Sequence, residues 1–253
     1  MKATLRLLLL VFFAGLSLQL YFVGRIALMA VLDPESTAFE RSAVFSVAST
    51  TGSLNWRQQW TPYSDISDHL KRAVIASEDA SFIEHDGVDI EALEKAWDTN
   101  AKVNAKAEQK AQQASGNPTP KAGGGRPAKP PKIIGGSTIT QQLAKNLFLS
   151  GERTLLRKGQ ELVLTILLEK LLDKERILEI YLNSVEWGEG VFGAEAAAQH
   201  YYRKSAANLS AFEAAKLAVM LPRPKYFETR PNSGYLSSRA GTIAARMASV
   251  EVP

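Results

Sequence analysis

The chain has 253 residues, of which 45% are hydrophobic, with no cysteine and only three histidines. The hydrophobic fraction is ample for a packed core, and the lack of cysteine excludes disulfides, thiolate metal sites and a cysteine nucleophile. The net charge of +4 arises in two segments, because residues 1–32 carry +3 and residues 100–132 carry +6 while the rest together carry −5. Because the positive charge is confined to these two segments and the sequence contains no known nucleic-acid-binding module, nucleic-acid binding is not expected.

Residues 1–32 predict a cytoplasmic N-terminus followed by a transmembrane anchor. Residues 7–24 are 18 uncharged residues, and as a helix they would span roughly 27 Å, close to the thickness of a bilayer core. Lys2 and Arg6 favour a cytoplasmic N-terminus, so the remaining chain is expected outside the cytoplasm. A cleaved signal peptide is the alternative, although Arg25 stands where a cleavage site would need a small residue.

Residues 33–59 are expected to form a periplasmic approach segment that is extended or loop-rich, with a short strand at 42–48. Residues 60–253 are expected to form the main domain. Within it, residues 100–132 look like a flexible basic insertion, since the 17 residues from 115 to 131 include nine Gly or Pro.

The main domain is predicted to be mostly α-helical. Capping residues and apolar periodicity place its helices. We expect a helix that begins at Asp68 and ends near residue 77, and a second that begins at Asp89 and continues through Lys102, Lys106 and Lys110. A third begins at a Thr138–Gln141 capping box and ends near residue 150, a fourth covers 155–172, and a fifth begins at Asp173. A sixth begins at a Ser210–Glu213 capping box and is ended by Pro222 and Pro224.

The first candidate site is the segment that contains Glu78, Asp79, Phe82 and His85, where two acids stand at a predicted helix end. Acids there oppose the helix macrodipole, and a carboxylate strained beside an aromatic ring can have its pKa raised toward general-base work. A solvated helix end, with the acids as turn residues, is the alternative.

The second candidate site runs from Gly135 to Asn146, where two glycines precede a capped helix and offer free N–H groups to an anion. Thr138, Gln142 and Lys145 fall at i, i+4 and i+7, so they share one helix face that is rich in hydrogen-bond donors. An ordinary amphipathic helix with its polar face in solvent is the alternative.

The third candidate site consists of Arg157, Lys158 and Glu161. Arg157 and Glu161 could form a simple surface pair at i,i+4, but Glu161 also opens a nearly continuous apolar run and so lies at the rim of a core. Together the three sites supply a carboxylate base, a second carboxylate and cations suited to phosphate. That set fits a displacement reaction with a phosphate leaving group.

Five segments resemble, in order, the five motif blocks of the peptidoglycan glycosyltransferases, over roughly residues 60–247 apart from the insertion. They read EDASFIEHDG, GGSTITQQLAKNLFLS, RKGQE, KERILEIYLNSVEWGEGVFG and LSAFEAAKLAVMLPRPKYF. The resemblance implies a lysozyme-like fold. Because the chain ends soon after the last block, we expect no transpeptidase domain, as in the monofunctional biosynthetic members.

The resemblance also implies a reaction. The growing glycan chain on undecaprenyl pyrophosphate is the donor, and lipid II attacks it through its GlcNAc 4-hydroxyl with inversion, giving a β-1,4 linkage in cell wall synthesis. Glu78 matches the catalytic base, and Glu161 matches a second essential carboxylate. The positions that match substrate-binding blocks are Asp79, Phe82, His85, Ser137, Thr138, Gln142, Lys145, Asn146, Arg157 and Lys158.

The role of Glu161 stays open between orienting Arg157 and holding a divalent cation. The family often uses Mg²⁺ or Mn²⁺, but no cofactor is obligatory and no metal-ligand spacing demands one. The expected partners are lipid II, the growing chain, the lipid bilayer and other cell-wall or division proteins. The expected location is the bacterial inner membrane, crossed once, with the catalytic domain in the periplasm.

Two other functions remain open from the residues alone. A lytic glycosidase on the same fold would need an acid and a sugar groove but not the cations, and an inactive scaffold would not need both carboxylates. For the basic insertion, contact with anionic lipid headgroups, pyrophosphate or a partner stands beside the alternative of an inert solvated loop.

Overall fold

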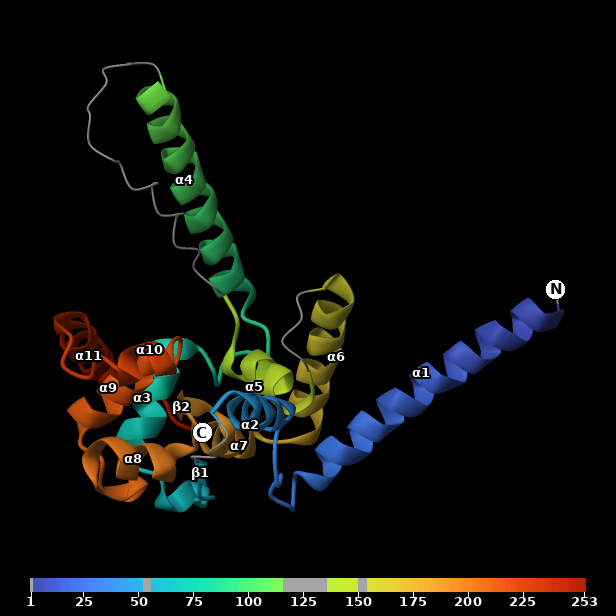
Figure 1. The fold of residues 1–253 in the computed structure, drawn as a ribbon, viewed down its shortest axis with the longest axis horizontal. Coiled ribbons are helices and arrows are strands. Elements are labelled where there is room, and N and C mark those ends of the chain that lie inside the picture. Colours follow the sequence, from blue (N-terminus) through green and yellow to red (C-terminus); the bar gives the residue numbers. More distant parts are fainter. Residues whose placement is uncertain (1, 52–55, 116–135, 150–153) are drawn as a thin grey trace. The chain divides into compact units, whose positions relative to one another are not determined.

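The computed structural model describes residues 2–51, 56–115, 136–149 and 154–253. As predicted, these residues are mostly helical (Figure 1). The chain divides into two compact units, of which the first joins Met1–Val88 to Thr138–Pro253 and the second is Asp89–Ser137. The α-helices are α1 (Lys2–Leu28), α2 (Ala38–Thr51), α3 (Asp68–Glu78), α4 (Ile90–Ser115), α5 (Ile139–Phe148), α6 (Leu155–Leu171), α7 (Lys174–Ser184), α8 (Ala194–Tyr202), α9 (Ala211–Met220), α10 (Pro224–Glu228) and α11 (Gly234–Arg246).

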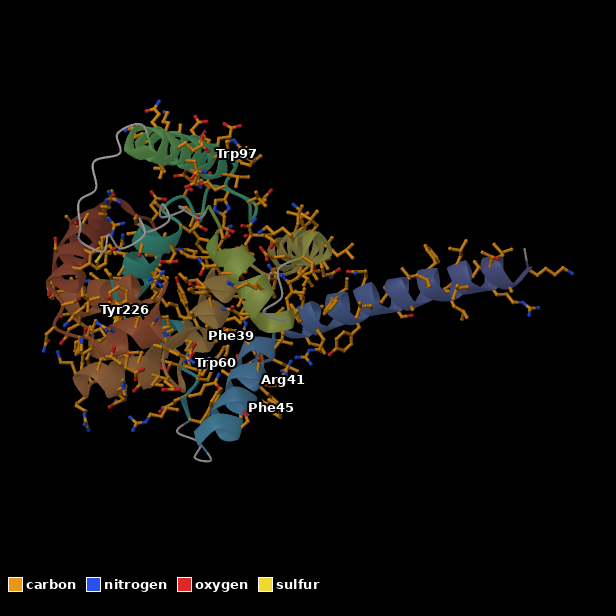
Figure 2. All side chains as sticks on the ribbon, turned by 45° about the horizontal axis from the view of Figure 1, so that its top comes forward. Phe39, Arg41, Phe45, Trp60, Trp97 and Tyr226 are labelled. Carbon is orange, nitrogen blue, oxygen red and sulfur yellow. The ribbon has the colours of Figure 1, made fainter. Side chains whose placement is uncertain are left out.

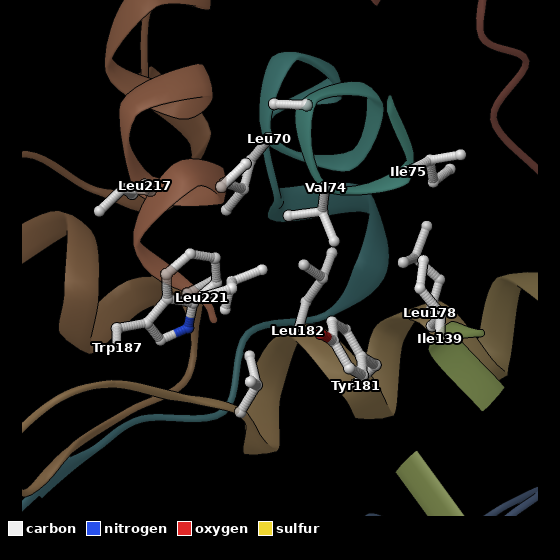
Figure 3. Close-up of a cluster of buried hydrophobic side chains, with 14 of the residues drawn as sticks. Leu70, Val74, Ile75, Ile139, Leu178, Tyr181, Leu182, Trp187, Leu217 and Leu221 are labelled. Atoms are coloured by element: carbon white, nitrogen blue, oxygen red, sulfur yellow. The ribbon is translucent and has the colours of Figure 1, made fainter. Parts of the chain in front are cut away.

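The core of the first unit lies between α3, α5, α7 and α9 (Figure 3). Leu70 and Val74 of α3, Ile139 of α5, Tyr181 of α7 and Leu217 of α9 are all completely buried. Burying one such aliphatic side chain contributes about 1.5–3 kcal/mol relative to leaving it exposed. This core therefore fixes the helix ends from which the candidate site residues project.

The predicted helix starts are confirmed where the sequence carries side-chain caps. Thr138 and Ser210 each form a complete capping box, and the side chain of Asp173 accepts a hydrogen bond from the backbone N–H of Arg176. Only the first helix of the domain starts differently, because Ser67 rather than Asp68 is its N-cap.

The approach segment is not extended, and the expected strand at 42–48 was wrong. Residues 38–51 form helix α2, which is opened by a reciprocal cap: the N–H of Thr37 donates to Glu40 at 2.7 Å, and the N–H of Glu40 donates to the Thr37 hydroxyl at 3.0 Å. This Thr-x-x-Glu spacing is itself a helix-start signal in the sequence. Phe39 packs on Phe192, whereas Phe45 is 77% exposed (Figure 2).

Residues 100–115 of the expected flexible insertion are the last part of α4, so that portion is helical. The Gly- and Pro-rich portion, 116–132, lies outside the described residues. On α4, Lys102 and Lys106 are exposed, as expected for a solvated basic stripe.

A small sheet of three strands, β1 (Arg57–Gln58), β3 (Val191–Phe192) and β2 (Glu186–Gly188), was not predicted. Strand β3 lies in the middle, parallel to β1 and antiparallel to β2. Strands of two or three residues carry too little alternation to be recognised from sequence.

Asn183 ties the segment before α3 to the end of α7. Its side-chain oxygen accepts the N–H of Thr61 at 2.8 Å, and its amide nitrogen donates to the carbonyls of Thr61 and Glu179 at 2.9 Å each. The side chain is completely buried. Its role is therefore structural, because all its bonds are to backbone atoms.

Helix α1 is long and apolar enough to cross a membrane, with a mean hydropathy of 2.2 over its most apolar 18 residues. Its C-terminal part packs on the domain, since Phe22, Ile26 and Met29 are buried. Closer to the N-terminus of α1, the Gln19 amide donates to Gln160 of α6 at 2.9 Å. The helix therefore has one face that belongs to the core of the first unit.

Arg176 of α7 holds the chain where it leaves α1. Its guanidinium donates to the carbonyls of Met29 at 2.7 Å and Leu32 at 3.0 Å, and it pairs with Asp33 and Glu179 at 2.8 and 2.7 Å. Carbonyls at the end of a helix lack partners within it, and a cation is favourable at that end. Arg176 provides both the hydrogen-bond donors and the positive charge.

Candidate active site

The first carboxylate of the site is Glu78, the last residue of α3. Its side chain accepts hydrogen bonds from the Gln142 amide at 3.1 Å and the Ser77 hydroxyl at 3.2 Å. Burial raises the pKa of Glu78, nearby Asp79 raises it further, and the bonds from Gln142 and Ser77 and the charge of Lys145 oppose the rise. A carboxylate that is costly to ionise takes up a proton more readily, as general-base work requires.

Asp79, the next residue, has a different role in the fold. One carboxylate oxygen accepts the N–H of Ile139, the first residue of α5, at 3.0 Å. The other lies 2.9 Å from His85 Nε2, and His85 Nδ1 accepts the N–H of Gly87 at 3.1 Å. In this arrangement Nε2 carries the proton and donates to Asp79. An anion at a helix N-terminus is stabilising, so Asp79 locks the first motif block onto α5.

Thr138 and Phe82 also help to hold the first motif block in place. The Thr138 hydroxyl donates to the Gly87 carbonyl at 2.6 Å and caps Gln141 of α5, and the residue is buried. Phe82 is completely buried, and the ammonium group of Lys174 lies 4.5 Å from its ring. These side chains are engaged within the protein. Their predicted contact with substrate stays a prediction.

Gly87 allows the first block to approach α6 closely. Its φ is +85°, and a Cβ there would come within 2.6 Å of Thr165 Cγ2. Only glycine adopts such a backbone without strain in so tight a space. Lys174 holds the same turn from the other side, because its ammonium group donates to the His85 carbonyl at 2.6 Å.

The second carboxylate, Glu161 of α6, is buried and paired with two cations. Arg157 Nη1 donates to one of its oxygens at 3.2 Å, and Lys158 donates to the other. Arg157 Nε is buried and has no hydrogen-bond partner among the described residues. A guanidinium carries several donors in a fixed fork, and this one still has a donor to offer.

Lys145 of α5 joins the two carboxylates electrostatically. The residue is exposed, yet desolvation lowers the pKa of its ammonium group; Glu161 and Glu78 raise that pKa, and Arg157 and Lys158 lower it. Three cations, Lys145, Arg157 and Lys158, therefore lie in one electrostatic field. The paired carboxylate in that field is Glu161. The excess positive charge suits an anionic leaving group.

The remaining predicted residues are placed as follows. Gln142 and Asn146 lie on α5 and are half-buried, and Gln142 contacts Glu78 directly. Ser137 is exposed and belongs to the second unit.

Replacing Asp79 by alanine is expected to lower stability rather than chemistry alone. The change leaves the Ile139 N–H and the His85 ring without their buried acceptor, which should cost about 3 kcal/mol in the free energy of unfolding. Denaturant unfolding checks this. Asp86→Ala, which changes an exposed acid of the same motif block, is the control and is expected to lie within about 0.5 kcal/mol of wild type. Unchanged stability in Asp79→Ala would show that Asp79 does not stabilise the contact between the first motif block and α5.

Comparison with known proteins places the chain. The sequence profile described as Transglycosylase matches residues 46–115 and 128–248. The chain is 50% identical over 243 residues to a biosynthetic peptidoglycan transglycosylase of Burkholderia thailandensis, covering 95% of this chain and 85% of that protein. It belongs to the transglycosylase family. A protein of the same name from Bordetella pertussis is 49% identical over 235 residues, covering 93% of this chain and 88% of that one.

This transglycosylase is therefore a glycosyltransferase with a lysozyme-like domain, and it polymerises glycan chains in peptidoglycan synthesis. The resemblance found in the sequence is confirmed, and neither a lytic enzyme nor an inactive scaffold fits the names of these relatives. The profile leaves residues 116–127 unmatched, within the segment expected to be an insertion.

Two residues that were not predicted for the site, Lys174 and Tyr181, contact it in the structure. Lys174 reaches the His85 carbonyl across 89 positions, and the Tyr181 hydroxyl reaches Gln142 across 39. No local pattern reports contacts over such separations. The only available signal was that both residues lie in the fourth motif block.

Glu161 of this transglycosylase does not fit the role of a metal ligand in the conformation described. Both of its oxygens already accept bonds from cations, and no group of three or more candidate ligands among the described residues includes it. The contact with Arg157 is the one that the alternative role, orienting Arg157, requires, and that role stays a prediction.

Proposed function

We propose that Glu78 is the base that takes the proton from the attacking hydroxyl of the acceptor. The observation that carries this proposal is the position of the Glu78 carboxylate, which is half-buried at the end of α3 and held by the Gln142 amide at 3.1 Å. Burial raises its pKa, and the charge of Lys145 acts on it. Asp79, its neighbour, is buried, and its two carboxylate oxygens are engaged by the His85 ring and by the N–H of Ile139, so it is held in the fold.

The proposed reaction joins the GlcNAc 4-hydroxyl of lipid II to C1 of the growing chain on undecaprenyl pyrophosphate. The hydroxyl oxygen forms a bond to C1 on the face opposite the leaving group, which gives inversion. The bond from C1 to the pyrophosphate oxygen breaks, and its electron pair leaves with the pyrophosphate. The hydroxyl proton goes to Glu78.

The leaving group is proposed to lie against Lys145, Arg157 and Lys158, with Glu161 as their positioning partner. Fixed cations favour charge that develops in the transition state, and they need no reorganisation when it appears. The Nε of Arg157 is buried and has no hydrogen-bond partner in the described part of the chain, so it provides a donor for a phosphate oxygen. In this proposal no metal ion is obligatory, and a Mg²⁺ or Mn²⁺ ion would act on the pyrophosphate itself.

We also propose that α1 anchors the enzyme in the bacterial inner membrane, with the N-terminus in the cytoplasm and the domain in the periplasm. Lys2 and Arg6 flank the apolar helix on its N-terminal side. Leu155 and Leu156 at the start of α6 are 92% and 88% exposed. Adjacent exposed leucines beside a membrane anchor are consistent with contact with the bilayer. Other cell-wall or division proteins remain candidate partners.

The experiment gives lipid II to the full-length protein in lipid vesicles and separates the products by size. Glycan polymer that depends on the enzyme, with release of undecaprenyl pyrophosphate, is the expected result. Cleavage of pre-made peptidoglycan without new polymer would contradict the proposed reaction.

A further inference from the structure

A chain of two hydrogen bonds leads from the core of the protein to Glu78. The Tyr181 hydroxyl, on α7, donates to Gln142 Oε1 on α5 at 3.0 Å. Gln142 Nε2 then donates to Glu78 Oε2 at the end of α3 at 3.1 Å. Three helices distant in sequence thus meet at one carboxylate.

The orientation of the Gln142 amide follows from its two neighbours. A carboxylate can only accept hydrogen bonds, so the NH₂ end of the amide must face Glu78. The oxygen end then needs a donor, and Tyr181 supplies it. Burial raises the pKa of Tyr181 well above its usual value, with the charges of Glu78 and Asp79 adding to the effect, so the hydroxyl keeps its proton.

Tyr181 is rigidly held. Its side chain is completely buried in the cluster that includes Ile139 and Leu182 (Figure 3). A half-buried glutamine such as Gln142 has several rotatable bonds and an amide that can flip. The Tyr181 ring has fewer rotatable bonds and is enclosed by core side chains. The fixed end of the chain is therefore Tyr181.

We propose that Tyr181 is a positioning residue, which holds the Gln142 amide in the one orientation that donates to the Glu78 carboxylate and so aims that carboxylate at the acceptor hydroxyl. This inference rests on the proposed role of Glu78 as the base. Tyr181 touches neither substrate nor the reacting atoms.

The proposal has a consequence for pH dependence. The groups that face Glu78 are Gln142, Ser77, Asp79 and Lys145, and among them the bond from Gln142 is the largest effect that lowers the pKa of Glu78. Without Tyr181 to fix the amide, that bond weakens and the pKa rises further. Because the base works when ionised, activity would then be lost at a higher pH as the solution is acidified.

The test is Tyr181→Phe in the full-length enzyme in lipid vesicles, which removes the hydroxyl but keeps the ring in the core. One lost hydrogen bond predicts a fall in kcat of about tenfold with little change in KM, together with an acid limb shifted to higher pH. Tyr202→Phe is the matched control, because the bond that its hydroxyl forms among the described residues is to the Glu213 carbonyl, at 3.4 Å. Equal effects of the two changes would overturn the proposal.

A double-mutant cycle with Gln142→Ala separates positioning from general stability. If Tyr181 acts through Gln142, Tyr181→Phe has no further effect on kcat or on the acid limb in the Gln142→Ala background. An undiminished effect in that background overturns the proposal, as does a Tyr181→Phe enzyme with wild-type kcat and acid limb. This failure differs from failure of the base itself, which would appear as normal polymer formation by Glu78→Gln.

Discussion

Replacing Glu78 by glutamine is expected to abolish polymer formation. The amide keeps the size of the side chain but cannot take a proton from the acceptor hydroxyl, and loss of a general base typically costs about 10²–10⁴-fold in rate. Stability should not fall, because Glu78 is costly to ionise where it stands and its pKa is raised by burial. Initial rates of polymer formation from lipid II, with thermal unfolding measured in parallel, check both statements.

The matched control is Glu84→Gln, an exposed acid six residues further along the same motif block. It should polymerise at the wild-type rate. Polymer formation by Glu78→Gln within tenfold of wild type would remove Glu78 from the role of base.

Replacing Glu161 by glutamine is expected to reduce activity by on the order of 10²-fold, because the cations at the pyrophosphate are then held less firmly in position. Arg157 and Lys158 would lose the carboxylate that both now contact. The pKa of Lys145 would fall further, because Glu161 is the main charge that raises it. The ammonium group would then lose its charge at a lower pH, so the defect should grow as the pH rises.

The control for Glu161 is Glu169→Gln on the same helix. Glu169 is also a buried, paired acid, since it lies 2.9 Å from Lys174 and accepts the Thr140 hydroxyl at 2.6 Å, but it contacts none of the proposed pyrophosphate ligands. It should lower thermal stability without a defect that grows with pH. If both variants share the same pH profile, Glu161 has no specific part in holding the cations.

The sequence predicted the features that local chemistry determines. For example, Thr138 and Gln141, which are three residues apart, predict the start of the helix at Ile139. Both caps are present in the structure as expected. The cap at Thr37 and Glu40 has the same spacing, so α2 was also predictable and was missed.

The division of roles between Glu78 and Asp79 could not be predicted in this way. The two acids are adjacent, yet one is the last residue of α3 and the other begins an extended turn, with φ of −163°. Their side chains therefore meet different surroundings: Glu78 faces Gln142, and Asp79 faces the start of α5, 60 residues away along the chain. Only the tertiary fold brings those partners to them.

The pH dependence of polymerisation by the wild-type enzyme shows whether a desolvated Glu78 is the base. A base whose pKa is raised is fully ionised only above that raised value, so activity is present at neutral pH and is lost as the pH falls through it. We expect a single acid limb in kcat/KM with an apparent pKa above 4.5, the usual value for glutamate, and the loss of activity should be reversible on return to neutral pH. Activity that stays constant down to pH 4.5 would contradict it.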